Sequence, residues 1–191
     1  MYVGGIDIER NAKELRIVIK TSRPGLIIGR SGEGTTRLRR RLDAFIRARG
    51  LSVPDFKIDI EEVRNPETNA AIVAYMVAEG LEKRMPFRRV MKATLDKVMA
   101  NREVKGARIA LSGMLGGASM SRKEELKKGQ VPLQTFRSDI DYARERANLP
   151  LGVIGIKVWI YKGEVFNEPT KRDANLRMHA NATNRASTRS R

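Results

Sequence analysis

Residues 23–33 read RPGLIIGRSGE, and the second half of this stretch decides how the first third of the chain is interpreted. A short apolar run ends there, and a helical period begins at Glu33. Two glycines three residues apart let the backbone turn tightly and approach another backbone closely. The free N–H groups at the start of the next helix favour anionic oxygen. We therefore interpret four residues as a candidate phosphate-binding loop: Gly29, Arg30, Ser31 and Gly32.

The helix that follows this loop is rich in arginine. Its apolar residues fall on one helical face, and its arginines spread over the remaining surface. Arginine makes charge-assisted hydrogen bonds to phosphate. The further candidates for phosphate contacts are therefore Arg37, Arg40 and Arg41.

Alternating apolar and polar residues predict strands on both sides of the loop. Ile6 and Ile8 begin a hairpin that returns through residues 15–20, and a third strand covers residues 56–61. A GxxG sequence alone usually marks an ordinary turn. The order strand, strand, short helix, GxxG loop, helix, strand resembles a KH domain of the second type, in which this loop clamps a single-stranded RNA backbone. We assign residues 1–64 to this domain.

Residues 65–165 predict a second domain of the α+β class. Pro66 is suited to opening a helix, and apolar stripes predict helices over residues 72–81 and 87–98. Strands are expected at residues 107–111 and 154–160, and a charged edge strand within residues 119–130. Residues 144–150 are expected to form the connection before the last strand. The arrangement is two helices on an antiparallel sheet, and residues 166–191 are expected to be a basic disordered tail.

Composition favours a polyanionic partner. The chain of 191 residues has 38 Lys and Arg against 22 Asp and Glu, a net charge of +16. Cations that neutralise phosphates release condensed counterions and so favour nucleic-acid binding. No apolar run approaches the ~20 residues that span a bilayer, so we expect no membrane partner.

Catalytic and cofactor motifs are not found in the sequence. Cysteine is absent, and the single histidine, His179, lies in the polar tail. The P-loop pattern does not occur, and Gly32 and Gly34 lack the third glycine of a dinucleotide fingerprint. Asp139 and Asp141 are the nearest candidate metal pair, and we interpret them as salt-bridge or turn residues. We therefore expect no enzyme activity, no cofactor, no metal and no small-molecule substrate.

Five segments in order resemble the family of bacterial-type small-subunit ribosomal protein three. They are residues 23–33, PFRRVMK at 86–92, SGMLGGA at 112–118, VPLQTFRSDIDY at 131–142 and GVIGIKVWIYKGE at 152–164. The resemblance covers roughly residues 5–165. It implies a protein of the cytoplasmic small subunit that binds rRNA in the head and contacts mRNA and neighbouring ribosomal proteins. Family members carry an N-terminal extension with the first KH helix, which we expect to be missing from this sequence.

The resemblance also implies a role for three cations where mRNA enters the small subunit. The matching residues are Arg88, Arg89 and Lys92, and the last two lie off the apolar stripe of their helix. The alternative is a solvated basic face with Arg88 partly packed along the helix. Further possible rRNA contacts, for each of which simple solvation is the alternative, are Arg23, Arg122, Lys123, Lys127, Lys128 and Arg137.

Two functions remain open from the sequence. The first is a structural, rRNA-binding constituent of the small ribosomal subunit. The second is a non-ribosomal KH-type protein that binds single-stranded RNA. The first 64 residues fit both, whereas residues 66–165 match only the ribosomal family. Trp159 alternates with Val158 and Ile160, so we expect it to point away from the core. We expect it to contact a protein or another domain rather than to form a base-stacking platform.

Overall fold

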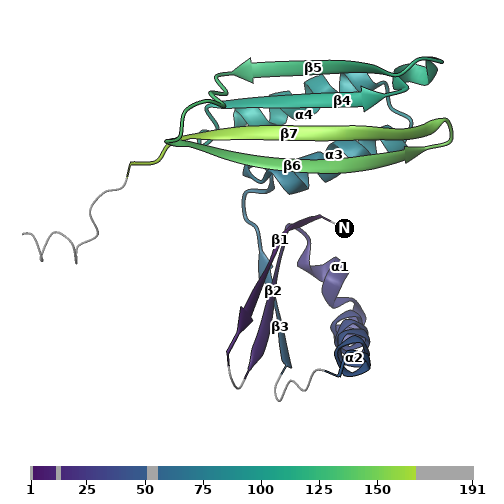
Figure 1. The fold of residues 1–191 in the computed structure, drawn as a ribbon, viewed down its shortest axis with the longest axis vertical. Helices are drawn as coiled ribbons and strands as arrows, with labels where there is room; N and C mark the ends of the chain where they lie inside the picture. Colours follow the sequence, from purple (N-terminus) through teal and green to yellow (C-terminus); the bar gives the residue numbers. More distant parts are fainter. Residues whose placement is uncertain (1, 12–13, 51–55, 167–191) are drawn as a thin grey trace, which may run out of the picture.

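A three-stranded mixed sheet forms the first unit (Figure 1). The computed structural model describes residues 2–11, 14–50 and 56–166. Strands β1 (Val3–Arg10), β2 (Leu15–Thr21) and β3 (Phe56–Glu62) lie in the order β1-β2-β3. β1 is antiparallel to β2, and β3 is parallel to it. Helices α1 (Pro24–Ile28) and α2 (Glu33–Ala48) connect β2 to β3, so the predicted KH order of elements is confirmed.

The two faces of this sheet differ in character. The register places Ile6, Ile19 and Ile60 side by side on one face. The opposite face carries ion pairs, including Lys20 with Asp7 at 2.7 Å. The apolar face is buried at Ile19 but 58% exposed at Ile6, on the edge strand β1. Half-burial of this kind is what the period-2 pattern of the sequence indicates.

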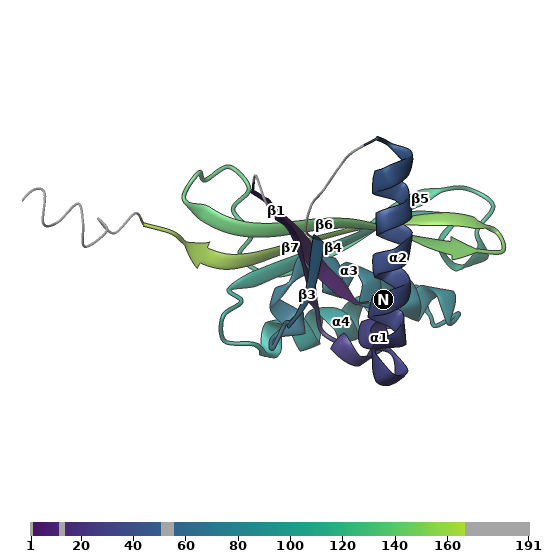
Figure 2. The ribbon, with the colours of Figure 1, turned by 90° about the horizontal axis from the view of Figure 1, so that it is seen from below.

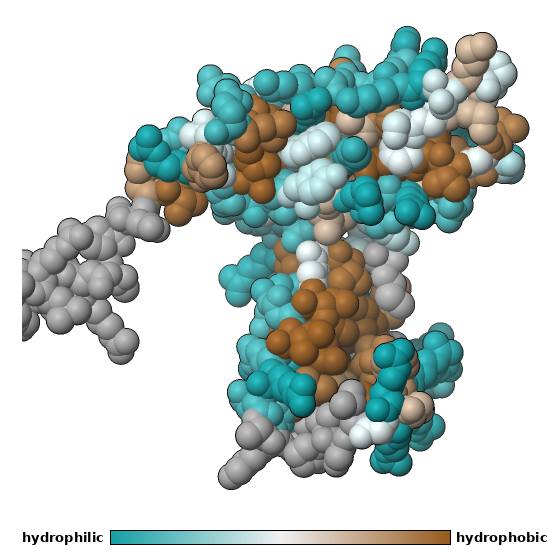
Figure 3. Space-filling model, in the orientation of Figure 1, coloured by the Kyte–Doolittle hydropathy of each residue, from teal (hydrophilic) through white to brown (hydrophobic). Residues whose placement is uncertain are grey.

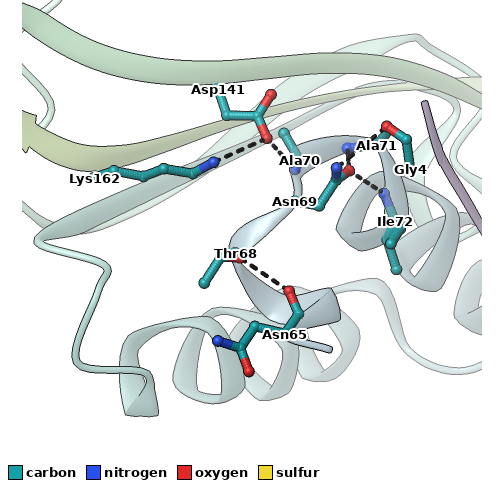
Figure 4. A network of polar contacts seen from close by, with 9 residues as sticks. All are labelled: Gly4, Asn65, Thr68, Asn69, Ala70, Ala71, Ile72, Asp141 and Lys162. Atoms are coloured by element: carbon teal, nitrogen blue, oxygen red, sulfur yellow. Dashed lines mark hydrogen bonds and ion pairs between the residues drawn. The ribbon is translucent and has the colours of Figure 1, made fainter. Parts of the chain in front are cut away.

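A short 3-10 turn and a capped helix lead into the second unit (Figure 4). Pro66 was expected to open a helix, but it opens only the turn η2 (Pro66–Thr68). Helix α3 (Ala70–Glu82) begins after Asn69, whose side-chain oxygen accepts from the N–H groups of Ala71 (3.0 Å) and Ile72 (3.2 Å). The cause is the N-cap: the Asn69 side chain satisfies free N–H groups of α3, whereas Asn65, which precedes Pro66, makes no side-chain capping bond.

The Asn69 side chain also joins the two units. Its Nδ2 donates to the backbone oxygen of Gly4 in β1 at 3.2 Å. On the other side of the helix start, the carboxylate of Asp141 accepts from the N–H of Ala70 at 2.8 Å and pairs with Lys162 at 3.8 Å. The interpretation of Asp141 as a salt-bridge residue is therefore confirmed.

Replacing Asn69 with alanine is expected to lower the free energy of unfolding by about 1 kcal/mol, the usual effect of losing an N-cap. Urea unfolding of both variants measures the difference. The matched control is Asn65→Ala, because the backbone oxygen of Asn65, rather than its side chain, accepts the bond from Thr68 (2.9 Å). Equal stability losses in the two variants would contradict the capping role.

The second unit is a four-stranded antiparallel sheet covered on one face by two helices (Figures 1 and 2). Strands β4 (Gly106–Gly113), β5 (Arg122–Gly129), β6 (Ser138–Leu149) and β7 (Gly152–Glu164) lie in the order β5-β4-β7-β6. Helix α3 packs on β6 and β7, and α4 (Phe87–Ala100) packs on β4 and β5. The predicted α+β class is confirmed, and the charged segment forms the edge strand β5. The core between these layers is formed by Val73, Val77, Met91, Val98, Ile109, Leu111, Ile156, Val158 and Ile160.

One expected connection is instead a strand. Residues 144–149 continue β6, which pairs with β7 from Ser138 opposite Glu164 to Leu149 opposite Gly152. The strand signal is weak in the sequence because its inward residues include Ala143 and Ala147 rather than large apolar side chains. The predicted tail, from residue 167 onward, lies outside the described residues.

Candidate nucleic-acid interface

The GxxG loop has the backbone geometry that its glycines allow. Gly29 ends α1, its N–H donates to the oxygen of Gly25 at 3.0 Å, and its φ is +70°. Gly32 caps α2 with a φ of +76°. Both values lie in the left-handed region that glycine enters without steric cost. Arg30 and Ser31 are exposed between them, at the tip of the turn.

A third glycine lets the loop close, and the sequence interpretation missed its role. A Cβ at Gly34 would lie 2.2 Å from the backbone oxygen of Ile27 and 2.9 Å from that of Ile28. Only glycine permits this approach of the first turn of α2 to the end of α1. The available signal was that Gly34 lies two residues after the GxxG motif, in the sequence GRSGEG of residues 29–34.

The three arginines predicted on α2 share one face of the helix. Arg37, Arg40 and Arg41 are spaced i, i+3 and i+4, so they are neighbours on the helix surface, and all three are exposed. Arg37 also pairs with Glu33 at 3.2 Å. The GxxG loop and these arginines therefore place exposed cations at the tip of the loop and along the first half of α2.

Arg23 has a structural contact. Its guanidinium lies 4.4 Å from the centre of the Tyr2 ring, close enough for a cation–π interaction. The Tyr2 hydroxyl donates to Glu79 in α3, which also pairs with Lys83 at 2.6 Å. The hydrogen bond from Lys83 and that from Tyr2 lower the pKa of Glu79. Arg23 is thus part of the contact between the two units.

The second predicted cluster lies at the start of α4, and its three cations differ. The inner face predicted from the sequence was Phe87, Met91, Thr94, Leu95 and Val98. The last four are buried, Phe87 is partly buried against the core, and Val90 is buried as well. Arg89 and Lys92 are exposed, and neither has an ion pair among the residues that the structure describes. Arg88 donates twice to Glu124 of β5, from Nε at 3.3 Å and Nη2 at 3.2 Å.

The two hydrogen bonds between Arg88 and Glu124 reduce the positive charge that Arg88 offers to a nucleic acid. The hydrogen bond from Arg88 lowers the pKa of the Glu124 carboxyl, so this carboxyl stays ionised at neutral pH and is protonated only under more acidic conditions than an ordinary glutamate. Bidentate geometry fixes the position of the guanidinium. Arg88 is thus directed toward Glu124 of β5 and partly neutralised.

Replacing Glu124 with glutamine is expected to make single-stranded RNA binding more salt-dependent. Glu124 pairs with Arg88 and also with Arg122, at 3.5 Å. Release of each cation adds one phosphate contact, and the slope of log affinity against log salt steepens by about 0.7 for each. Measuring affinity over a range of salt concentrations checks this. Glu103→Gln removes the same charge from an exposed turn and controls for the change in net charge. Identical slopes in the two variants would show that Glu124 restrains neither Arg88 nor Arg122.

The remaining predicted cations are mostly engaged within the protein. Arg122 pairs with Glu124 at 3.5 Å, Lys123 with Glu125 at 3.5 Å, and Lys128 with Asp96 at 2.8 Å. Arg137 lies 5.6 Å from the centre of the Phe166 ring. Lys127 is exposed and has no ion pair within the described ranges. The structure therefore has two separate basic surfaces, one at the GxxG loop in the first unit and one on α4 in the second unit.

No three His, Asp or Glu side chains in the described part of the chain gather in a way that could hold a metal ion. None of the helices described is both long and apolar enough to cross a membrane.

Comparison with known proteins gives similarities along most of the chain. A family model described as "KH domain" matches residues 1–68, and one described as "Ribosomal protein S3, C-terminal domain" matches residues 77–160. A small ribosomal subunit protein uS3 from Clostridium botulinum (strain Okra) is 43% identical over 180 residues, which is 94% of this chain and 77% of the relative. A protein of the same name from Saccharophagus degradans is 43% identical over 173 residues, 91% of this chain and 74% of the relative.

Proposed function

Because this chain belongs to the family of small ribosomal subunit protein uS3, we propose that it binds rRNA in the small-subunit head and lines the entrance through which mRNA passes. Its role is structural, and the family is not enzymatic. In this proposal the protein works in the cytoplasm as part of the assembled subunit, beside neighbouring ribosomal proteins and mRNA.

The observation that carries the mRNA role is the rigid placement of cations on α4. Five buried side chains hold the helix on the sheet, so Arg89 and Lys92 project from a fixed element. Cations that contact phosphate position a nucleic acid without reading its sequence. A fixed basic surface of this kind suits a message that must move past regardless of its sequence, and Arg88 borders it.

The GxxG loop supports a separate RNA contact. An exposed Arg30 at the tip, two left-handed glycines and the free N–H groups of a sixteen-residue helix make a site for a phosphate backbone. We assign this site to rRNA. It also fits the second candidate, a non-ribosomal KH-type protein that binds single-stranded RNA.

Co-sedimentation with small subunits separates the two candidates. The ribosomal proposal predicts that the protein, expressed in cells, stays with small subunits after a high-salt wash, because many contacts anchor it at once. Release into the soluble fraction at salt concentrations that leave other ribosomal proteins bound would overturn the ribosomal proposal. It would favour the non-ribosomal one.

A further inference from the structure

The outer face of the second sheet is left open by the fold. Helices α3 and α4 cover one face only, and no described helix lies on the other (Figure 1). Alternation along β7 puts Val158 and Ile160 in the core and Lys157 and Trp159 on this outer face. Figure 3 shows that hydrophilic and pale side chains cover most of its middle. The predicted outward direction of Trp159 is confirmed, and the structure now supplies its neighbours.

Two aromatic side chains and a guanidinium lie together at the centre of this face. Register places Arg108 of β4, Trp159 of β7 and Tyr142 of β6 in one row across three strands. The Tyr142 and Trp159 rings have centres 5.3 Å apart, and the Arg108 guanidinium lies 4.9 Å from the Trp159 ring. The Tyr142 side chain is 49% exposed. A single-stranded base can stack on an exposed ring of this kind.

The charge of the face is strongly one-sided. Among the described outward residues of the four strands there is one carboxylate, that of Glu125, and there are six cations. Glu125 is already neutralised by Arg108 at 2.6 Å and Lys123 at 3.5 Å. The cations that have no ion pair within the described residues are Lys127, Lys157, Arg144 and Arg146.

Small side chains in the middle of the outer face leave room above the sheet between these cations. The next two rows carry Ala110 and Ser112 on β4 and Gly155 on β7. Lys123 and Arg146 stand on the two edge strands of the same row as Ser112. A nucleic-acid strand can thus approach the sheet between flanking cations.

We propose that this outer sheet face, centred on Tyr142 and Trp159, is a third RNA-binding surface that takes unpaired bases. The aromatic pair accepts a base by stacking, and the four unpaired cations contact the backbone on either side. The face is distinct from both the GxxG loop and α4. A protein partner is disfavoured because the face presents net positive charge and few large apolar side chains.

The chain has one tryptophan, so its fluorescence reports on this face alone. Titrating the full chain with a short oligouridylate is expected to quench Trp159 emission in a saturable, salt-dependent way, because a stacked base quenches indole. The same response is expected when Arg30 and Ser31 are replaced by Asp. Tyr142→Ala is expected to weaken this binding roughly fivefold or more, whereas Tyr142→Phe keeps it.

Several results would overturn the proposal. Binding of the labelled oligonucleotide without a change in Trp159 emission would place the RNA elsewhere, while leaving the proposed ribosomal function intact. Equal quenching by a duplex of the same length would exclude base stacking. A Trp159 response to small-subunit proteins but not to RNA would make this face a protein contact. Failure of the protein to co-sediment with small subunits would overturn the ribosomal function but would not contradict RNA binding by the outer sheet face.

Discussion

Replacing Arg88, Arg89 and Lys92 together with alanine is expected to slow translation through stable mRNA hairpins and to leave unstructured messages nearly unaffected. The three cations stand on a helix held by Val90, Met91 and its other buried residues, so the fold should persist. In the proposed function, only a structured message presents resistance at the mRNA entrance, and cations that hold its backbone help the ribosome to open its base pairs. Time-resolved translation of paired messages, identical except for a hairpin, measures the difference.

The structure divides this effect among the three residues. Loss of Arg89 and Lys92, which have no ion pair in the described chain, should reduce the salt slope of single-stranded RNA binding by about 1.4, at about 0.7 per contact. Loss of Arg88 should add less, since Glu124 already holds it. Lys97→Ala, on the same helix and also exposed, is the matched control. Equal slowing on both messages would contradict a role in opening mRNA hairpins. Failure of the triple variant to assemble into small subunits would indicate that these cations anchor the protein to rRNA instead.

Replacing Arg30 and Ser31 with two aspartates is expected to weaken RNA binding at the GxxG loop roughly 10- to 100-fold, the range for losing a charge-assisted hydrogen bond. Two added carboxylates also repel phosphate. The backbone should tolerate the change, because Ser31 has a φ of +50° and aspartate is among the residues found there. Amide shifts of Gly29 and Gly32 during titration with a tetranucleotide follow this site alone.

A matched variant controls for net charge. Arg102→Asp with Gln130→Asp makes the same change of three charge units at exposed positions of the second unit. It should leave binding at the loop close to that of the unmodified protein. Unchanged binding in the loop variant, or equal weakening in both variants, would remove the loop from the RNA-binding surface.

The first unit could be predicted because its signals are local. Alternation at Ile6, Ile8 and Ile17 and the helical period after Glu33 each arise within a few neighbours, and Gly29 and Gly32 mark the turn between helices. Pro66 and Asn69 both carry helix-start signals, and only the hydrogen bonds of Asn69 decide between them. In β6, alanines at the inward positions hid the strand from a search for large apolar residues.

Which partners the site residues have could not be predicted from the sequence, because these contacts join residues far apart in the chain. Arg88 and Glu124 are 36 positions apart and meet because β5 lies at the edge of the sheet beside α4. The row of Arg108, Trp159 and Tyr142 requires the strand order β4-β7-β6, which does not follow the order of the chain. The direction of Trp159 followed from alternation, whereas its aromatic and basic neighbours did not.

Mapping the RNA cross-links of this protein in cells tests the central claim most directly. The ribosomal account predicts that residues of the GxxG loop cross-link to small-subunit rRNA, and that α4 cross-links to mRNA just downstream of the decoding site. Both sets should co-purify with assembled small subunits. Cross-links confined to free cellular messages, with no rRNA among them, would contradict the account and support a non-ribosomal KH protein.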